Sequence, residues 1–327
     1  MEDKAVITGA TGFLGSNLAK KLNSLGFKVV ALGRNRQKGS LLQNEGIEFV
    51  CADLSDKDEI SNALKGARFV FHCAAKSSLW GRYKDFYNSN VLGTKNMLDL
   101  AKKSGAERFI HVSTPSIYFD FKDRFNIKED EKLPEQFVNN YAQTKYLAEI
   151  EADKAFKDGL NVITIRPRGI YGTGDTALIP RLIRANQEKF IPKTVKDDIL
   201  IDITHVQNVV ESLICAMKAD AVCFGKKYNI TDGTPVHFYK MLEELLAGLG
   251  YSLNVKNLNY SKTAFLAGVM ENFYKTFLPD IEPVFTKYYL GLLSFNMTLD
   301  IKKAREELGY TPLFSTKEGI KKVIEGK

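Results

Sequence analysis

The feature that most constrains the fold is a glycine run between an apolar stretch and an amphipathic stretch. Gly9, Gly12 and Gly15 are spaced three residues apart. They follow the β-branched run Ala5–Thr8 and open the helix-like stretch Phe13–Leu25. A strand, a glycine-rich turn and a helix in this order predict the first part of a βαβ crossover, and therefore a parallel sheet.

The same alternation continues through the first half of the chain. Five more short runs rich in β-branched and aromatic residues predict strands at Lys28–Leu32, Ile47–Cys51, Arg68–His72, Arg108–Val112 and Asn161–Arg166. Three amphipathic stretches between them predict helices at Lys57–Leu64, Asn90–Lys103 and Tyr141–Phe156. The expected fold class is α/β: a doubly wound parallel (Rossmann) sheet with a smaller C-terminal substrate lobe.

In this context the glycine run indicates a dinucleotide-binding turn. The first glycine permits the tight turn, the second lets backbone approach a pyrophosphate, and the third allows close packing of helix on sheet. Free N–H groups at the start of the following helix, at its positive dipole end, attract the phosphates. The expected cofactor contacts here are Gly9, Thr11, Gly12, Phe13, Leu14 and Gly15.

The end of the second strand bears on the choice of cofactor. About 20 residues after such a turn, an acid usually binds the ribose 2′-hydroxyl of NAD. This chain has Arg34 and Arg36 there and no acid. Because a guanidinium neutralises a 2′-phosphate, we predict that NADP(H) is preferred, with NAD(H) as the alternative. A solvated arginine pair without a role in selectivity is the competing interpretation.

Further cofactor contacts are expected after the third, fourth and sixth strands. Asp53 can accept a hydrogen bond from the adenine amino group, or it can cap the next helix. Small residues after the fourth strand let the cofactor lie flat. The added contacts are Asp53, Leu54, Ala74, Ala75, Lys76 and Pro167, with Tyr141 and Lys145 on a later helix, where Lys145 can bond the nicotinamide ribose.

The alternation ends near Pro167, which sets the expected domains. Residues 1–166 are expected to form the NAD(P)-binding Rossmann domain, with 199–231 returning to it. Residues 167–198 and 232–327 are expected to form the substrate-binding lobe. In this lobe, 262–278 carries an apolar stripe at helical spacing. The stripe fits packing in the lobe, a lid over an apolar substrate, or peripheral membrane contact.

Composition excludes several function classes. Lys and Arg number 46 against 39 acids, and they form no basic stripe, which argues against nucleic acid as a partner. The four cysteines have neither zinc-site spacing nor a disulfide framework, so we expect no metal and a reducing, cytoplasmic location. We find no signal peptide, and no apolar run of about 18 residues that would indicate a membrane span.

Tyr141 and Lys145 are the first candidates for catalysis. They are four residues apart on a predicted helix, so both side chains share one face. An ammonium near a phenol is expected to lower the phenol pKa from about 10. Tyr141 can then exchange a proton with an alcohol or ketone while hydride moves to or from a nicotinamide. An exposed Tyr–Lys pair is the structural alternative.

The segment after the fifth strand supplies hydroxyl groups beside this pair. Ser113 and Thr114 follow Val112 at the carboxyl edge of the sheet, where ligands bind in such folds. Either hydroxyl can donate a hydrogen bond to the reacting oxygen. Asn90 begins a predicted helix, where it can hold a relay water or serve a purely structural role.

The motifs together resemble the extended short-chain dehydrogenases/reductases over nearly the whole chain. They read GATGFLG, FHCAAK, NSNVLGTKN, HVSTPSIY, YAQTK, RPRGIYGTGD and THVQNVV. HCAAKSSLWG followed by STPSIYFD is most similar to the 3β-hydroxysteroid dehydrogenase branch, which includes bacterial 2-alkyl-3-oxoalkanoate reductases. The resemblance implies Tyr141 as acid/base, Lys145 as its partner and Thr114 as the catalytic hydroxyl, with Ser113 as the fallback. It also implies a homodimer.

The resemblance implies an NAD(P)-dependent oxidoreductase that interconverts a secondary alcohol and a ketone. The expected partner is a small hydrophobic substrate, either a 3-oxo acid or a 3β-hydroxysteroid-like ring. Lys76 and Arg82 are candidates for binding a substrate carboxylate.

Two alternatives remain open. A nucleotide-sugar epimerase/dehydratase is disfavoured because Gly169 and Gln207 replace residues usual in those enzymes, although Arg181 and Arg184 keep it open. A catalytically inactive NADP(H)-sensing binding protein is the alternative from another class.

Overall fold

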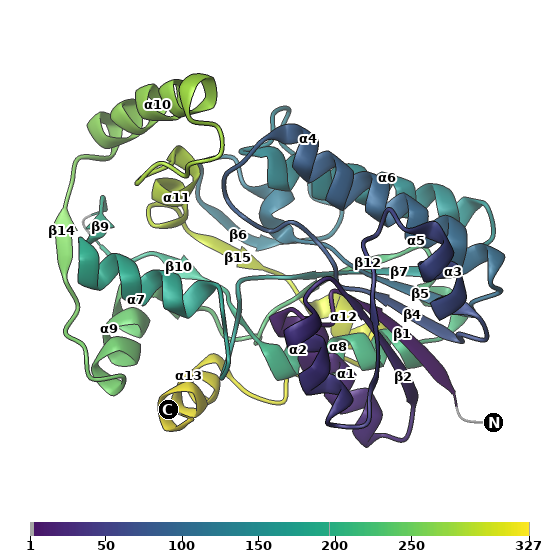
Figure 1. Cartoon of the computed structure of the whole chain (residues 1–327). Coiled ribbons are helices and arrows are strands. Elements are labelled where there is room, and N and C mark those ends of the chain that lie inside the picture. The colour runs from purple at the N-terminus through teal and green to yellow at the C-terminus, as the bar shows by residue number, and fades with distance from the viewer. Residues whose placement is uncertain (1–2, 196, 327) are drawn as a thin grey trace.

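A computed structural model of the chain describes residues 3–195 and 197–326, and a seven-stranded parallel sheet lies at its centre (Figure 1). The strand order is β12-β7-β5-β4-β1-β2-β3. These strands are β1 (Lys4–Thr8), β2 (Lys28–Gly33), β3 (Glu48–Cys51), β4 (Phe69–His72), β5 (Arg108–Val112), β7 (Val162–Pro167) and β12 (Lys227–Ile230). The chain winds outward from β1 in both directions, which confirms the predicted fold class.

Helices cover both faces of this sheet because neighbouring residues of each buried strand point to opposite sides. Ala5 and Ile7 of β1 pack with one set of helices, and Val6 packs with the other. The first set is α1 (Phe13–Ser24), α2 (Arg36–Gln43), α8 (Val206–Lys218) and α12 (Lys302–Leu308). The second set is α3 (Lys57–Leu64), α5 (Gly93–Lys103) and α6 (Asn140–Lys157).

Two helical segments differ from the sequence-based expectation. The helix expected from Asn90 starts as the short α4 (Tyr83–Phe86), continues as a π-helix over Tyr87–Leu92, and becomes α-helical only in α5. The polar helix α2 was not predicted. Its start is fixed by Asn35, whose side chain accepts a 2.9 Å hydrogen bond from the Lys38 N–H. π-Helices are rare and concentrate at functional sites, which directs attention to the segment around Asn90.

Smaller sheets lie beside the large one, and of their strands only β6 precedes β7 among the described residues. The four-stranded sheet has the order β13-β10-β15-β6, and β11-β8 and β14-β9 form two-stranded pairs. These strands are β6 (Arg124–Ile127), β8 (Ile170–Tyr171), β9 (Ile191–Lys193), β10 (Leu200–Ile201), β11 (Thr204–His205), β13 (Val236–His237), β14 (Val255–Asn257) and β15 (Met297–Leu299). Of the segment 199–231, β10 and β11 therefore lie in small sheets, whereas α8 and β12 pack on and in the large one.

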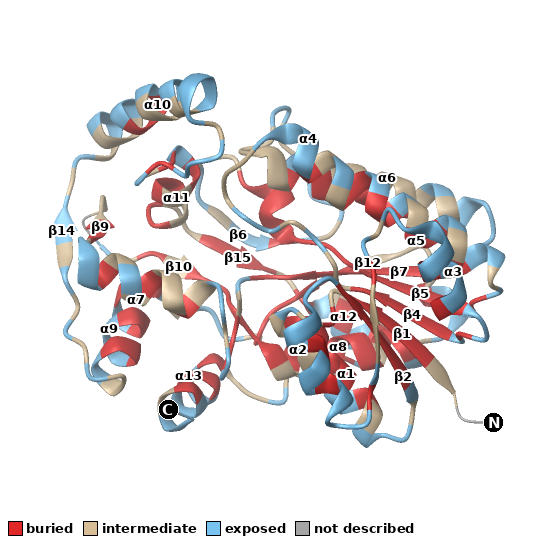
Figure 2. Ribbon diagram, viewed as in Figure 1, coloured by how far each residue is buried: buried red, intermediate tan, exposed pale blue. Residues whose placement is uncertain are grey.

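Two further buried clusters lie outside the two that flank the large sheet (Figure 2). One cluster joins α7, α9 and α13, and another joins β6 and β15 to Tyr288 of α11. The remaining helices are α7 (Leu178–Glu188), α9 (Phe238–Gly248), α10 (Tyr260–Phe277), α11 (Lys287–Leu292) and α13 (Thr316–Glu325), with 3-10 turns at Pro115–Tyr118 and Ala221–Cys223.

Helix α10 carries the apolar stripe predicted from sequence, but this stripe is not packed in the lobe. Ala267 and Gly268 are the buried residues of α10. Its large apolar side chains are half or more exposed, at Phe265, Leu266, Val269, Phe273 and Phe277 (Figure 2). Among the described residues, no helix is both long and apolar enough to cross a membrane.

Candidate active site

The glycine turn between β1 and α1 leaves no room for side chains. A Cβ on Gly9 would lie 2.8 Å from the backbone of Ala74, and Gly9 has a positive φ of 68°. A Cβ on Gly15 would lie 2.4 Å from the Gly9 carbonyl oxygen. Gly12 precedes α1 and offers no side-chain cap. The first N–H groups of α1 therefore form an anion cradle that fits the pyrophosphate of a dinucleotide.

The adjacent ends of β1 and β4 are held by a buried histidine. Thr8 Oγ1 lies 2.8 Å from His72 Nδ1, and Thr94 Oγ1 lies 2.9 Å from Nε2. Burial lowers the pKa of His72 to about 3, so the ring is neutral. His72 is thus a packed strand residue, and its partner Thr8 also accepts a 3.2 Å hydrogen bond from the Ala74 N–H beside the glycine turn.

The catalytic hydroxyls lie at the carboxyl end of β5. Thr114 lies close enough to the phenol of Tyr141 to lower its pKa. The Thr114 hydroxyl also donates to the Ser116 hydroxyl at 3.0 Å and accepts from the Ser116 N–H at 3.2 Å. Thr114 Oγ1 is therefore held in place on the side that faces Tyr141.

Ser113 points away from this pair because successive residues of an extended segment face opposite sides. Its buried Oγ has no hydrogen-bond partner among the described residues, whereas its N–H donates to the Ile165 carbonyl of β7 at 2.7 Å. The geometry thus separates the two candidate hydroxyls and places Thr114, not the fallback Ser113, at the phenol.

Tyr141 and Lys145 share a face of α6, but their side chains have different partners. Lys145 Nζ donates to the carbonyl oxygen of Val112, the last residue of β5, at 2.7 Å. Burial lowers the pKa of Lys145 to about 8. Burial raises the pKa of Tyr141 to about 12, and the hydrogen bond with Thr114 only partly opposes this. The expected lowering of the phenol pKa by Lys145 is therefore absent from this arrangement, because the ammonium is aimed at the strand end.

Helix α6 is fixed to the sheet by a buried ion pair. Arg166 Nε donates to Glu149 Oε1 at 2.8 Å, and Arg166 Nη2 donates to Oε2 at 2.5 Å. Arg166 also donates to the phenol oxygen of Tyr118. Burial raises the pKa of Glu149, but the charge of Arg166 and its hydrogen bonds, with the charge of Lys227 and other smaller contributions, together outweigh this and hold that pKa below its usual value. The pair sets the position of the helix that carries Tyr141 and Lys145.

Asn90 occupies the π-helix and is fully buried. Its Oδ1 accepts from the Lys76 N–H at 2.8 Å. Its Nδ2 donates to the Lys76 carbonyl at 3.1 Å and to Thr144 Oγ1 at 3.0 Å. Asn90 thus ties the loop after β4 to α6, which favours its structural role, and a relay water remains a prediction.

The two side chains predicted to bind the adenosine end of the cofactor lie together on the protein surface. Arg34 follows β2, Asp53 follows β3, and their side chains form an exposed ion pair at 3.6 Å. The helix cap is Asp56, whose Oδ1 accepts from the Glu59 N–H at 3.2 Å, so the alternative role of Asp53 as a cap is wrong. The carboxylate of Asp53 accepts from Ser55.

The other predicted cofactor contacts lie around the same edge. Leu54 packs against Gly93 at the start of α5, and its carbonyl accepts from Asn96 at 3.0 Å. Ala74 is half-buried and Ala75 is exposed. Pro167 is the buried last residue of β7. Thr11 lies beside Gly33, Phe13 is half-buried at the start of α1, and Leu14 is buried there.

The cations predicted to bind a substrate carboxylate or diphosphate have partners within the chain. Lys76 pairs with Asp85 at 3.6 Å. Arg82 pairs with Asp280 at 2.6 Å. Arg181 pairs with Glu282, whereas Arg184 is exposed.

Two residues near the catalytic hydroxyls, Tyr288 and Arg168, were not singled out from the sequence. Tyr288 of α11 donates to the Ser116 hydroxyl at 3.0 Å, which links the C-terminal lobe to Thr114. Arg168 follows β7 and is buried close to Tyr288. The sequence feature that could have indicated these residues is a polar side chain within an otherwise apolar or loop segment. Their proximity to Thr114, however, depends on the fold.

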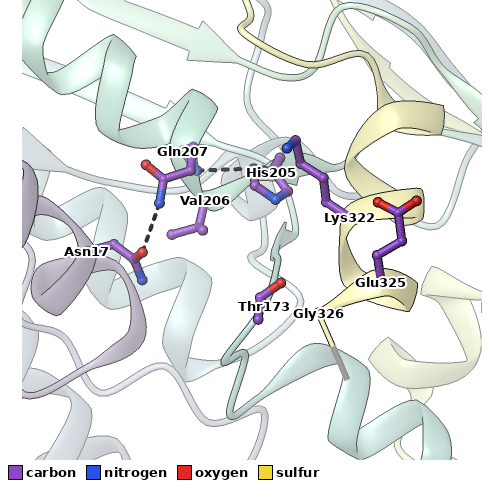
Figure 3. Close-up of a pocket in the computed structure, with 8 residues that line it drawn as sticks. All are labelled: Asn17, Thr173, His205, Val206, Gln207, Lys322, Glu325 and Gly326. Atoms are coloured by element: carbon purple, nitrogen blue, oxygen red, sulfur yellow. Dashed lines mark hydrogen bonds between the residues drawn. The ribbon is translucent and has the colours of Figure 1, made fainter.

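A cavity of about 420 Å³ lies away from these groups (Figure 3). It opens between α1, the start of α8 and α13. Its lining residues are Asn17, Thr173, His205, Val206, Gln207, Lys322, Glu325 and Gly326. Gln207 crosses from α8 to α1 and donates to Asn17 Oδ1 at 2.9 Å. None of the predicted catalytic residues lines this cavity.

Comparison with known families agrees with this geometry. The model of the 3-beta hydroxysteroid dehydrogenase/isomerase family matches residues 6–259, from the glycine turn through the catalytic helix and beyond. The chain belongs to this family. The resemblance inferred from sequence is confirmed, and the protein is an enzyme of the extended short-chain dehydrogenase/reductase class.

Curated members of the same group support this placement. The chain is 33% identical over 98% of its length, and 78% of the relative's, to 3beta-hydroxysteroid-dehydrogenase/decarboxylase isoform 1 of Arabidopsis thaliana. It is 30% identical to 2-alkyl-3-oxoalkanoate reductase of Stenotrophomonas maltophilia (strain K279a), over 98% of both chains. Among solved structures, MoeE5 in complex with UDP-glucose and NAD is similar to this chain, with a TM-score of 0.74 and 25% sequence identity. The match covers 99% of this chain and 98% of MoeE5.

Proposed function

We propose that the protein interconverts a secondary alcohol and a ketone on a hydrophobic substrate, either a 3-oxo acid or a 3β-hydroxysteroid-like ring. The observation that carries this is the placement of Thr114 beside the Tyr141 phenol at the sheet edge next to the glycine turn. The names of the two curated relatives support an oxo or hydroxyl group on an apolar carbon skeleton as the reacting part.

Each residue of the site has its own role in the proposed reaction. A nicotinamide cofactor, when bound, supplies or accepts the hydride. Thr114 donates a hydrogen bond to the reacting oxygen and orients it toward the phenol. Tyr141 gives a proton to that oxygen in reduction and takes it back in oxidation. Lys145 donates a hydrogen bond to the Val112 carbonyl at the end of β5, which holds its ammonium at the site.

Reduction assays test this function directly. We would measure NADPH and NADH consumption with a long-chain 2-alkyl-3-oxo acid and with a 3-oxosteroid. We expect turnover of at least one ketone and a loss of about 100-fold or more in Tyr141→Phe. Turnover that survives unchanged in Tyr141→Phe would contradict the assigned acid/base, and binding of NADPH without any turnover would favour the inactive sensing protein.

NADP(H) is the cofactor we propose as preferred, because Arg34 stands where an acid would bind the ribose of NAD. Arg34 pairs only weakly with exposed Asp53, at 3.6 Å, so a 2′-phosphate can displace that carboxylate. MoeE5, which was solved with NAD, keeps NAD(H) as the alternative.

A nucleotide-sugar epimerase is the second candidate, since MoeE5 was solved with UDP-glucose and NAD. Against it, Arg181, a candidate for the sugar-nucleotide diphosphate, is engaged with Glu282. Tightly retained NAD after purification, together with activity on a UDP-sugar, would favour this candidate.

We also propose a membrane contact and a dimer. The exposed apolar face of α10 touches a membrane surface, because Phe265, Phe273 and Phe277 are more than half exposed. Flotation with anionic liposomes tests this contact, and failure of the protein to float would exclude it. A homodimer is also expected, and analytical ultracentrifugation would test it.

A further inference from the structure

Arg168 is a buried cation that the reaction described above does not use. Its side chain is 9% exposed. Within residues 3–195 and 197–326, its guanidinium has no hydrogen-bond acceptor and no ion-pair partner, and its electrostatic neighbours are Tyr288 and Asp202. A buried charge is usually paired, because losing water around a lone guanidinium is costly. Among the described residues, Arg168 therefore has no anion in direct contact, and Asp202 acts on it only as a more distant opposite charge.

Its backbone is held rigidly at the carboxyl edge of the large sheet. The Arg168 N–H donates to the Ile230 carbonyl of β12 at 3.1 Å. The Thr204 hydroxyl donates to the Arg168 carbonyl at 2.6 Å. The residue directly follows β7, which pairs with β5, the strand that ends at the catalytic hydroxyls. The guanidinium is thus carried by a fixed strand end and not by a mobile loop.

A short chain of side chains connects Arg168 to the reacting centre. The Arg168 charge opposes the rise that burial causes in the pKa of Tyr288. Tyr288 donates to Ser116 at 3.0 Å, and Thr114 donates to the same Ser116 oxygen at 3.0 Å. Thr114 is the partner of Tyr141. Through Tyr288 and Ser116, Arg168 is therefore connected to Thr114, the residue assigned to hold the reacting oxygen.

The carboxylate in the vicinity is already engaged elsewhere. Asp202 Oδ2 accepts a 2.8 Å hydrogen bond from the Leu299 N–H, and the carboxylate lies beyond ion-pair distance of Arg168. Burial raises the pKa of Asp202 to about 6. The nearby cations Lys76 and Arg82, in contrast, have their own carboxylate partners.

We propose that Arg168 binds the carboxylate of the substrate, so that the enzyme acts on acids whose carboxylate stands close to the reacting carbon, as in 3-oxo and 3-hydroxy acids. This inference rests on the proposed function and specifies its substrate class. An arginine fork bonds a carboxylate through two parallel N–H groups, which also fixes the orientation of the reacting oxygen.

The test compares a stable acid with its neutral ester. The substrates are 2-hexyl-3-hydroxydecanoic acid and its methyl ester, oxidised with NADP⁺ or NAD⁺. The variants are Arg168→Met, Arg168→Lys and, as the matched control, Arg82→Met. We expect Arg168→Met to lower kcat/KM for the acid about 30-fold or more, mainly through KM, and to change that for the ester by less than about threefold. Arg168→Lys should recover part of the acid activity, and Arg82→Met should keep the wild-type ratio of acid to ester.

Calorimetric titration of the acid into the NADPH-loaded protein separates this inference from the proposed function. Binding that is lost in Arg168→Met but not in Arg82→Met supports the carboxylate site even if no variant turns over. Equal kcat/KM values for acid and ester in the wild type, or equal losses for both substrates in Arg168→Met, would contradict the carboxylate site at Arg168. Neither result would contradict the proposed function. Thermal melting and NADPH affinity check the fold, and Arg168→Lys is the second variant if Arg168→Met does not fold.

Discussion

Glu149 and Arg166 form a two-pronged ion pair between the middle of α6 and the end of β7, and both side chains are almost completely buried. The pair lies two turns along α6 from Tyr141, so it determines where the phenol stands relative to Thr114. Breaking a buried pair by removing one partner leaves an uncompensated charge in the interior.

We expect Glu149→Gln to lower the free energy of unfolding by about 3–5 kcal/mol. The matched control is Glu151→Gln on the same helix, which breaks the surface pair with Lys154 and should cost less than about 1 kcal/mol. Urea unfolding of both variants measures the difference. A Glu149→Gln variant within 1 kcal/mol of the wild type would contradict a structural role for the pair.

The opposite orientations of Ser113 and Thr114 give a second prediction. Because Thr114 lies beside the phenol, whereas the buried Ser113 hydroxyl has no hydrogen-bond partner among the described residues, Thr114→Val should lower kcat about 100-fold and Ser113→Ala only a few-fold. Steady-state kinetics with one ketone substrate, at saturating NADPH, measures both. A larger loss in Ser113→Ala would reverse the assignment.

The burial of Tyr141 predicts different pH profiles for the two directions. Its pKa is raised to about 12, so the phenol remains protonated at neutral pH and can act as an acid in ketone reduction. Alcohol oxidation requires the phenolate, whose fraction rises tenfold per pH unit below that pKa. We therefore expect kcat/KM for oxidation to rise with slope about 1 from pH 6 to 9, and kcat/KM for reduction to stay flat.

Rate profiles in both directions check this expectation. An oxidation profile that already levels off below about pH 8 would show that the phenol titrates much lower in the working complex. The Lys145 ammonium, whose own pKa is lowered to about 8, would then be the group to examine.

The sequence predicted the parts of the fold that local patterns determine. The order of strands and helices up to β7 follows from short apolar runs and the glycine turn, and Lys57–Leu64 and Arg108–Val112 agree with α3 and β5 to the residue. The π-helix before α5 was not predicted, because its backbone is set by the contact of Asn90 with Lys76 and Thr144, which are distant in sequence.

The candidate site was predictable only in part, for the same reason. Tyr141, Lys145 and Thr114 stand out because each belongs to a local motif at a strand end or on a helix. The direction of the Lys145 ammonium depends on the Val112 carbonyl across the sheet, and the pairing of Arg82 with Asp280 joins segments almost two hundred residues apart. Local sequence patterns do not predict such contacts between distant segments.

Cofactor selectivity supplies the last prediction. Arg34 is the cation at the end of β2, with 77% of its side chain exposed, and Arg36 begins α2 nearby. If Arg34 binds the 2′-phosphate, Arg34→Ser should weaken NADPH binding roughly tenfold and change NADH binding less than twofold, since an exposed charge–phosphate contact is worth about one power of ten. Arg36→Ser is the control for the loss of a positive charge. Fluorescence titration gives the dissociation constants, and equal NADH and NADPH affinities in the wild type would show that the arginine at this position does not select the cofactor.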